Sequence, residues 1–286
     1  MEFWLVTTDH LSTRIWFRDD EDYRMGMNLV AILACVLGVQ VLAFELMSNH
    51  VHFVLHGTHE QAKHFCDEYK KRYSQYLNKK YGTKDFLRKV AVDILLVDGM
   101  DESLERAIAY VQMNCVAARI CLSPTGYPWG TGNAFFKATP VKGRRIDMFS
   151  KRSLRLLLHS TEELPPHLLV GEEGYILPEC YVQVQWVESI FRTPQRMDFF
   201  LRSSSKAKKR LDEKEWVPSF KDQLVLAAIP DLCQSLFRKS SMVSLNEEEL
   251  VELVKQLRYR FSSGIHQLMR VTGLSYERVV RLLDRV

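Results

Sequence analysis

Two histidines stand one residue apart in "FELMSNHVHFVLHG", residues 44–57, a stretch that otherwise has the composition of a buried β-strand. Side chains alternate between the two faces of a strand, so His50 and His52 share one face and Val51 and Phe53 the other. Two imidazoles on one face can bind a single metal ion. Because histidines also occur as hydrogen-bonded core residues, the pair alone leaves a metal site and a core role open.

A tyrosine and an asparagine further along the chain could supply the other groups of such a site. Tyr110 and Asn114 are four residues apart in a helix predicted over residues 102–120, so they share one helix face. The apolar stripe of this helix comprises Leu104, Ile108, Val111 and Cys115. Tyr110 lies away from the centre of the stripe. Two interpretations remain, a tyrosine at the rim of the core and a reactive phenol.

Alternating strand and helix patterns must position these groups. Strands are predicted at residues 1–8, 39–47, 50–57 and 90–97, and helices at residues 23–37, 60–80 and 102–120. Gly38 and Gly82 follow two of the helices as C-terminal caps, and Asp101 is the expected N-cap of the third. The first six elements have the βαββαβ order, which predicts an α+β fold, a ferredoxin-like antiparallel sheet with helices on one face.

The remainder of the chain is predicted to be mainly helical. Residues 137–220 have the composition of a connector with short elements, and residues 221–286 are expected to form a separate helical region. Near its end, the apolar spacing fits two helices joined at Gly273, as in a helix-turn-helix. A small packing bundle is the alternative. In the DNA-binding interpretation the exposed contact residues are Tyr276, Arg278 and Arg281.

The composition is that of a folded globular protein, with 47% hydrophobic and 26% charged residues among 286, which excludes wholesale disorder. The longest apolar stretch, residues 29–44, contains Gly38 and Gln40 and is shorter than the roughly 20 residues that a bilayer crossing needs. Six cysteines are scattered without a CxxC pair. We therefore expect reduced thiols, a cytoplasmic location and no membrane span.

Basic residues cluster although the net charge is only +4. Residues 70–89 contain eight basic residues and one acid, interleaved with tyrosines. Such a run can neutralise a DNA backbone while aromatic rings stack on unpaired bases, although at least two of the tyrosines are expected to pack in the core. A hydrated surface is the simpler alternative. The candidate DNA-binding residues are Lys70, Lys71, Arg72, Lys79, Lys80, Arg88 and Lys89.

Six stretches between about Phe3 and Phe136 resemble, in this order and spacing, the single-tyrosine HUH transposases, in particular the REP-associated tyrosine transposases of bacteria. They are "RDDEDY", "LMSNHVHFVL", "KKRYSQYLNKKYG", "ILLVD", "AYVQMNCVAARI" and "GYPW". The combination of "MSNHVHFVL" with "YVQMN" is specific, whereas neither half alone would be.

This resemblance implies residue roles and a reaction. Matched position by position, His50 and His52 become metal ligands, Asn114 the third ligand and Tyr110 the nucleophile. The reaction implied is cleavage and rejoining of single-stranded DNA at hairpin or REP-like repeats through a 5′-phosphotyrosine intermediate. The ligand set suits Mg²⁺ or Mn²⁺. The implied partner is single-stranded or hairpin DNA in a bacterial cytoplasm, and a homodimer stays open because relatives include monomers and dimers.

The chain departs from the family after Asn114, where relatives commonly have proline and this chain has Cys115. We therefore expect the helix geometry beyond Asn114 to differ. Two rival functions share parts of this pattern. A metal-dependent hydrolase would need further histidine and aspartate motifs, which the remaining histidines do not form. A domesticated, non-cleaving DNA-binding regulator would keep the same scaffold, but the complete set of four residues favours retained chemistry.

Overall fold

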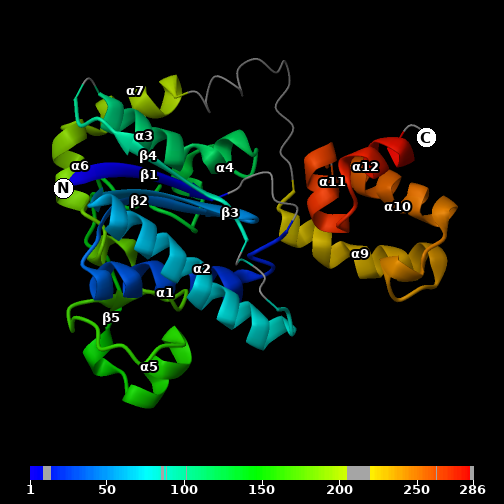
Figure 1. The fold of residues 1–286 in the computed structure, drawn as a ribbon, viewed down its shortest axis with the longest axis horizontal. Coiled ribbons are helices and arrows are strands. Elements are labelled where there is room, and N and C mark those ends of the chain that lie inside the picture. Colours follow the sequence, from blue (N-terminus) through cyan, green and yellow to red (C-terminus); the bar gives the residue numbers. More distant parts are fainter. Residues whose placement is uncertain are drawn as a thin grey trace.

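The computed structural model describes residues 1–8, 14–84, 87, 89–100, 102–204, 220–261 and 263–283. Its centre is a four-stranded antiparallel sheet with the strand order β2-β3-β1-β4 (Figure 1). The strands are β1 (Glu2–Thr8), β2 (Gln40–Met47), β3 (His50–Gly57) and β4 (Val92–Val97). Helix α1 (Asp20–Leu37) precedes β2, and α2 (His59–Tyr81) precedes β4. The predicted α+β fold with a split βαβ sheet is confirmed.

The first two helices begin and end at residues that favour caps. Asp19 caps the start of α1, and Thr58 forms a capping box with Gln61 at the start of α2. Gly38 and Gly82 follow the last turns with φ angles of 62° and 67°, a left-handed conformation that glycine adopts without strain. Both predicted C-terminal caps are therefore confirmed.

Helices cover both faces of the sheet (Figure 1). On the first face, Phe53 of β3 packs against Phe65 and Tyr69 of α2, with ring centroids 5.3 and 5.4 Å apart. The second face is covered by α3 (Ser103–Gln112), α6 (Val184–Phe191) and α7 (Pro194–Ser203). Val54 of β3 belongs to this second core. The sequence predicted helices on one face, and α3, α6 and α7 add a layer that the ferredoxin-like pattern does not contain.

Short elements in residues 114–180 complete the layers around the sheet. They are α4 (Asn114–Ala117), α5 (Lys151–Leu158), β5 (Arg144–Arg145), β6 (Leu169–Val170) and the 3₁₀ helices Pro124–Gly126, Ile146–Met148 and Pro178–Cys180. Ile146 and Leu158 are buried in the core that α1 and α2 share with the sheet. Residues predicted to connect two regions thus contribute to the core.

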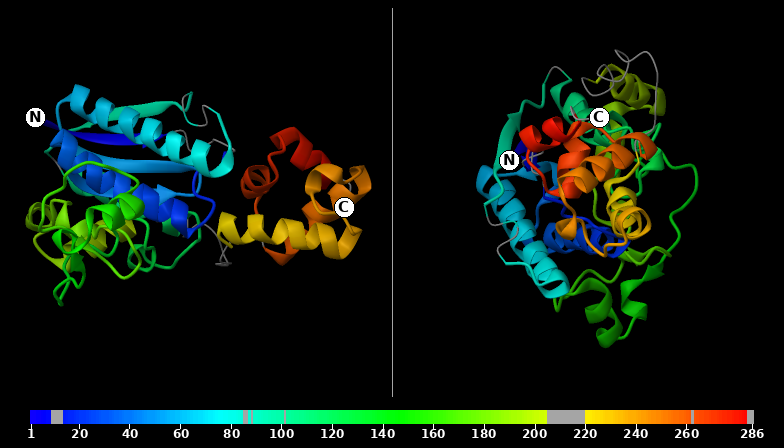
Figure 2. Two further views of the ribbon diagram at one scale, coloured as in Figure 1. Left: turned by 90° about the horizontal axis from the view of Figure 1, so that it is seen from below. Right: turned by 90° about the vertical axis from the view of Figure 1, so that its right-hand side faces the viewer.

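Four helices form the C-terminal region, seen at one end of the molecule in Figure 2. They are α9 (Asp222–Phe237), α10 (Glu247–Arg260), α11 (Ile265–Thr272) and α12 (Tyr276–Leu283), with a 3₁₀ helix at Met242–Ser244. Val225, Leu257 and Val279 lie in their own apolar core. Gly273, with φ of 71°, ends α11 and allows the turn into α12. The predicted helix–glycine–helix arrangement is present.

A buried carboxylate joins this region to the sheet. Asp222, only 4% exposed at the start of α9, accepts a 2.5 Å hydrogen bond from Ser48 Oγ in the β2–β3 turn. Arg270 of α11 donates to the same carboxylate from Nε at 2.7 Å and from Nη2 at 3.1 Å. Charge-assisted bonds in a buried setting are short and directional. The turn before His50 and the first helix of the helix–glycine–helix unit therefore share one carboxylate.

None of the helices that the structure describes is long and apolar enough to cross a membrane. All six cysteines fall within the described ranges, and each is a free thiol.

Candidate functional site

The two histidines lie at the start of β3, directly after the two-residue turn that joins it to β2. Their ring centroids are 4.7 Å apart with an interplanar angle of 86°. His52 is 1% exposed, while His50 is partly exposed. Alternation along the strand, which predicted that both side chains share a face, thus places the two imidazoles side by side on the α3 side of the sheet.

Each histidine is oriented through its Nδ1 atom. His50 Nδ1 lies 2.8 Å from Asn49 Oδ1, and His52 Nδ1 lies 3.1 Å from Thr7 Oγ1. An amide oxygen only accepts, so Nδ1 of His50 carries the proton and the lone pair of the ring is on Nε2. That is the tautomer in which a histidine binds a metal through Nε2.

Asn49 and Thr7 were not singled out in the sequence as functional residues. The position of Asn49 directly before His50 is the sequence signal that could have identified it. Thr7 becomes apparent once the register is known, because Thr7 of β1 pairs directly with His52 of β3. Each of the two side chains contacts the ring of a predicted metal ligand.

We expect Asn49→Ala to weaken Mn²⁺ binding by about 10- to 100-fold, because the ring of His50 loses its orienting acceptor. Titration of the purified protein with Mn²⁺, followed by calorimetry, measures the change. Asn78→Ala is the matched control, since Asn78 of α2 bonds with Thr83 and lies on the other face of the sheet. An Asn49→Ala protein that binds Mn²⁺ as tightly as the wild type would remove Asn49 from the site.

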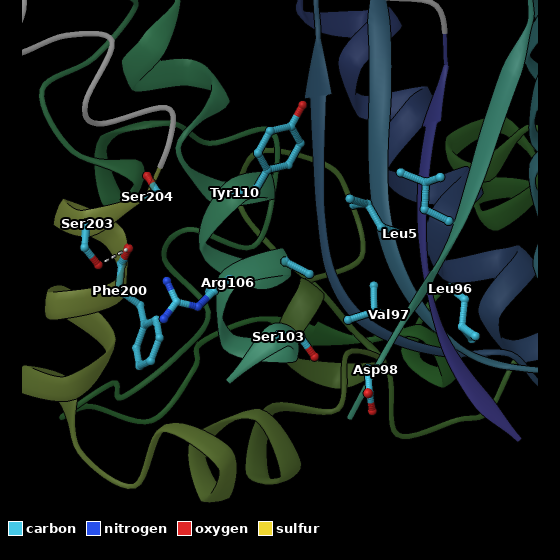
Figure 3. Close-up of a pocket in the computed structure, with 12 residues that line it drawn as sticks. Leu5, Leu96, Val97, Asp98, Ser103, Arg106, Tyr110, Phe200, Ser203 and Ser204 are labelled. Carbon is cyan, nitrogen blue, oxygen red and sulfur yellow. Dashed lines mark hydrogen bonds between the residues drawn. The ribbon is translucent and has the colours of Figure 1, made fainter. Parts of the chain in front are cut away.

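Tyr110 of α3 leans toward the sheet and lies next to His52, with ring centroids 5.9 Å apart and an interplanar angle of 88°. Burial raises the pKa of the Tyr110 phenol above its ordinary value of 10.0. The ring borders a cavity of about 530 Å³ between α3 and the sheet (Figure 3). Arg106 lies one turn before Tyr110 on the same wall, and Leu5 and Val97 form the sheet side of the cavity.

The helix that carries Tyr110 is interrupted, so the predicted continuous helix over residues 102–120 is wrong in this respect. Helix α3 ends at Gln112, Met113 has φ −87° and ψ 3°, and α4 begins at Asn114. The Asn114 side chain donates from Nδ2 to the carbonyl oxygens of Tyr110 at 3.0 Å and Val111 at 2.9 Å. A side-chain amide that occupies these acceptors competes with the helical hydrogen bonds.

At its other end, α3 starts at Ser103 after Glu102, which adopts a left-handed φ of 62° without a side-chain cap. The predicted N-cap, Asp101, lies outside the described residues. The interruption between α3 and α4 lies between the predicted nucleophile, Tyr110, and the predicted third ligand, Asn114. It therefore determines how these two residues are placed relative to each other.

The donor set fits a divalent cation. Within the described part of the chain, no group of three His, Cys, Asp or Glu side chains could hold a metal ion. The His50–His52 pair therefore needs an oxygen donor of another type, and the amide oxygen of Asn114, at the start of α4, is the predicted candidate. Two neutral imidazoles and an amide oxygen leave the charge of a cation uncompensated, so it would attract phosphate oxygens.

The basic residues of α2 are on the opposite face of the sheet from Tyr110. Tyr69, which packs against Phe53, marks the buried side of α2. Several of the predicted contact residues already bind an acidic side chain or the backbone. Lys70 donates from Nζ to the Val90 carbonyl, and both Lys71 and Arg72 form ion pairs with Glu68. Lys80 forms ion pairs with three acids, Asp19, Glu21 and Asp22. Lys79 and Lys89 are exposed, and Arg88 lies outside the described residues. The residues of this run that the structure describes on α2 are not brought to the histidines.

The tyrosines of α2 are mainly core residues. Tyr69 and Tyr73 are fully buried and Tyr76 is 8% exposed, so three of them pack in the core as predicted for at least two. Tyr81 is half-buried, and its hydroxyl bonds with Asp19 and Asp22. These rings stabilise the contact of α2 with α1 rather than forming a stacking surface for bases.

On α12, the three predicted contact residues differ in their surroundings. Tyr276 is 46% exposed, and Arg281, five residues further along the helix, is exposed as well. Arg278 forms an ion pair with Glu247 of α10. Two of the three side chains therefore remain accessible on the second helix of the helix–glycine–helix unit.

Two comparisons with known proteins found matches. Residues 14–91 match the protein family described as "Transposase IS200 like". Among solved structures, one described as "Structure of the REP associates tyrosine transposase bound to a REP hairpin" matches with 13% sequence identity and a TM-score of 0.37, covering 46% of this chain and 77% of that chain. No curated protein matches the chain.

Proposed function

We propose that this chain, whose residues 14–91 form an IS200-like transposase domain, is a metal-dependent single-stranded DNA endonuclease and transposase. It would cleave and rejoin DNA at hairpin or REP-like repeats through a 5′-phosphotyrosine intermediate. The observation that carries the proposal is the position of Tyr110, whose ring is 5.9 Å from that of His52 while His50 and His52 are 4.7 Å apart. A phenol next to a pair of imidazoles is the arrangement that metal-assisted attack on phosphorus needs.

In the proposed reaction, the Tyr110 oxygen attacks a DNA phosphorus while the bond from phosphorus to the 3′ oxygen breaks. The phenolic proton is released, the departing 3′ oxygen gains a proton, and the DNA downstream of the break stays linked to Tyr110 through its 5′ phosphate. Attack by a 3′ hydroxyl reverses the step and rejoins a strand, so no ATP is needed. Arg106, on the cavity wall one turn away, can hold the phosphate in place.

His50, His52 and Asn114 would hold the divalent cation, Mg²⁺ or Mn²⁺. When bound, the cation would stabilise the negative charge that develops on the phosphate oxygens. Thr7 and Asn49 keep the two rings in their orientation through the Nδ1 contacts. The buried side of the site, formed by His52 and Asn114 at 1% and 4% exposure, excludes most water from these ligands.

The direct test is incubation with end-labelled hairpin oligonucleotides from repeats of the host genome, with Mg²⁺ or Mn²⁺, followed by denaturing electrophoresis. We expect a labelled, protease-sensitive species that migrates more slowly than free DNA and disappears with EDTA. If no repeat yields this covalent species while hairpins still bind, the non-cleaving DNA-binding regulator becomes the better description.

The cytoplasmic location, a homodimer and the division of the chain into regions at residues 136 and 220 remain predictions.

For α11 and α12, we propose binding to duplex DNA beside the cleavage site, with Tyr276 and Arg281 as exposed contacts and Arg278 fixed by Glu247.

Arg281→Ala is expected to weaken binding of duplex-flanked hairpins. If Arg281 contacts a phosphate, the slope of log binding constant against log salt concentration should also fall by about 1. Bare hairpins should bind as before. Arg152→Ala, an exposed arginine on α5, is the matched control. Equal losses for both DNA types would contradict a duplex-specific role.

A further inference from the structure

A backbone donor at the helix break has an acceptor from outside the helix. In a continuous α-helix, the N–H of Cys115 would donate to the carbonyl of Val111, four residues earlier. Here the Val111 carbonyl accepts from Asn114 Nδ2 at 2.9 Å, and the Cys115 N–H instead donates to Glu45 Oε1 at 2.6 Å. The break is thus held by two side chains, and one of them comes from the sheet.

Glu45 belongs to β2 and is 3% exposed. It pairs directly with His52 in the antiparallel register, so the two side chains leave the sheet on the same face. Through its hydrogen bond with the Cys115 N–H, the Glu45 carboxylate therefore connects β2, which pairs with His52, to the residue that follows Asn114. Neither the catalytic proposal nor the core packing otherwise explains a buried carboxylate at this position.

The loop around Gly130 fixes Glu45 from the other side. Gly130 forms an antiparallel bridge with Glu45. A Cβ atom added at Gly130 would lie 2.7 Å from the Phe44 carbonyl oxygen and 3.3 Å from Glu45 Cγ, too close for the loop to keep this position. The absence of a side chain at Gly130 lets the loop pack directly on β2 beside Glu45.

We propose that Glu45 is a positioning residue for the DNA cleavage reaction, a role that rests on the function proposed above. Its carboxylate anchors the α3–α4 junction to β2, so Tyr110 on one side of the break and Asn114 on the other keep their places relative to His52. A buried N–H without an acceptor is unfavourable, so loss of the carboxylate would shift the junction until the N–H found another partner. The histidines, on the sheet, would stay where they are.

The test uses variants that separate the acceptor from the charge. Glu45→Gln keeps an oxygen acceptor at the same distance along the side chain, and Glu45→Met removes it at similar volume. We expect kcat for adduct formation to fall about 100-fold in Glu45→Met, as a shift on the order of 1 Å at a reacting group does, with hairpin Kd unchanged. Glu45→Gln should stay within about threefold of the wild type, because the hydrogen bond survives.

A second substitution tests the bond itself. Proline at position 115 has no N–H and is tolerated in the first turn of a helix, where α4 would place it. In the Glu45→Met background, Cys115→Pro should therefore restore at least about tenfold of the lost kcat, because no donor is left without an acceptor. Glu188→Met is the matched control, since Glu188 of α6 also accepts a backbone N–H, from Phe136 at 2.5 Å.

The outcomes are distinguishable. Adduct formation by the wild type with unchanged kcat in Glu45→Met overturns the positioning role but leaves the proposed function. A loss of more than about 100-fold in Glu45→Gln also overturns it, because the charge and not the acceptor would then be required. Absence of adduct in the wild type overturns the proposed function instead. Thermal melting by circular dichroism identifies unfolding of Glu45→Met, in which case Glu45→Gln alone decides.

Discussion

Tyr110→Phe is expected to abolish the covalent protein–DNA species and to lower the cleavage rate by at least about 1000-fold, because it removes the attacking oxygen. The substitution leaves the ring that lies next to His52, so the fold and DNA binding should be unchanged. Labelled hairpin DNA and denaturing electrophoresis measure the adduct. Tyr175→Phe is the matched control, since the Tyr175 hydroxyl makes a long, 3.5 Å contact to the backbone carbonyl of Pro128. An adduct that persists in Tyr110→Phe would assign the nucleophile to another residue.

The pH dependence of the wild type provides a second check on Tyr110. Burial raises the pKa of its phenol above 10.0, so the neutral form dominates at pH 7 and the ionised fraction grows about tenfold for each unit of pH. If attack requires the ionised oxygen, the adduct rate should rise continuously between about pH 6 and pH 9 at saturating Mn²⁺. A plateau within that range would mean that a group with a lower pKa controls the rate.

Replacement of either histidine is expected to have the second large effect. His50→Ala or His52→Ala removes one of the two imidazoles and should lower Mn²⁺ affinity and the cleavage rate by at least about 100-fold, more than loss of a residue that only orients a ligand. EDTA should abolish cleavage by the wild type, and added Mn²⁺ should restore it.

His56→Ala is a closely matched control for these variants. His56 is on the same strand and the same face as His50 and His52, but its Nδ1 bonds with Gln40 at 2.6 Å and its ring contacts Trp186. Its replacement should leave Mn²⁺ affinity unchanged. If all three histidine variants lose activity equally while Mn²⁺ affinity is constant, the histidines would be structural rather than metal ligands.

The features that depend on local pattern were predictable from the sequence. Alternation along one strand placed His50 and His52 on a common face, and Gly38, Gly82 and Gly273 predicted where three helices end. These signals are local because each depends on a few neighbouring residues. The order of strands and helices along the chain then limited the possible topologies to the split βαβ sheet.

The features that depend on distant partners were not predictable. After the helix break, the N–H of Cys115 donates to Glu45, seventy positions earlier in the chain, and no propensity at Met113 indicates the break. The orienting role of Thr7 follows from the β1–β3 register. The positive charge predicted for residues 70–89 is present on α2. The sequence alone could not show that α2 lies on the face of the sheet away from Tyr110.

The bonds made by Asp222 have a consequence for DNA geometry. Ser48, two residues before His50, and Arg270 of α11 are held by one buried carboxylate, so the α9–α12 region cannot rotate freely relative to the strand that carries the histidines. A protein with two rigidly connected DNA contacts measures a distance along its substrate. Insertions between duplex flank and hairpin would then lower cleavage even when they add a whole helical turn, because about 10.5 base pairs move one contact by about 34–36 Å along the DNA axis.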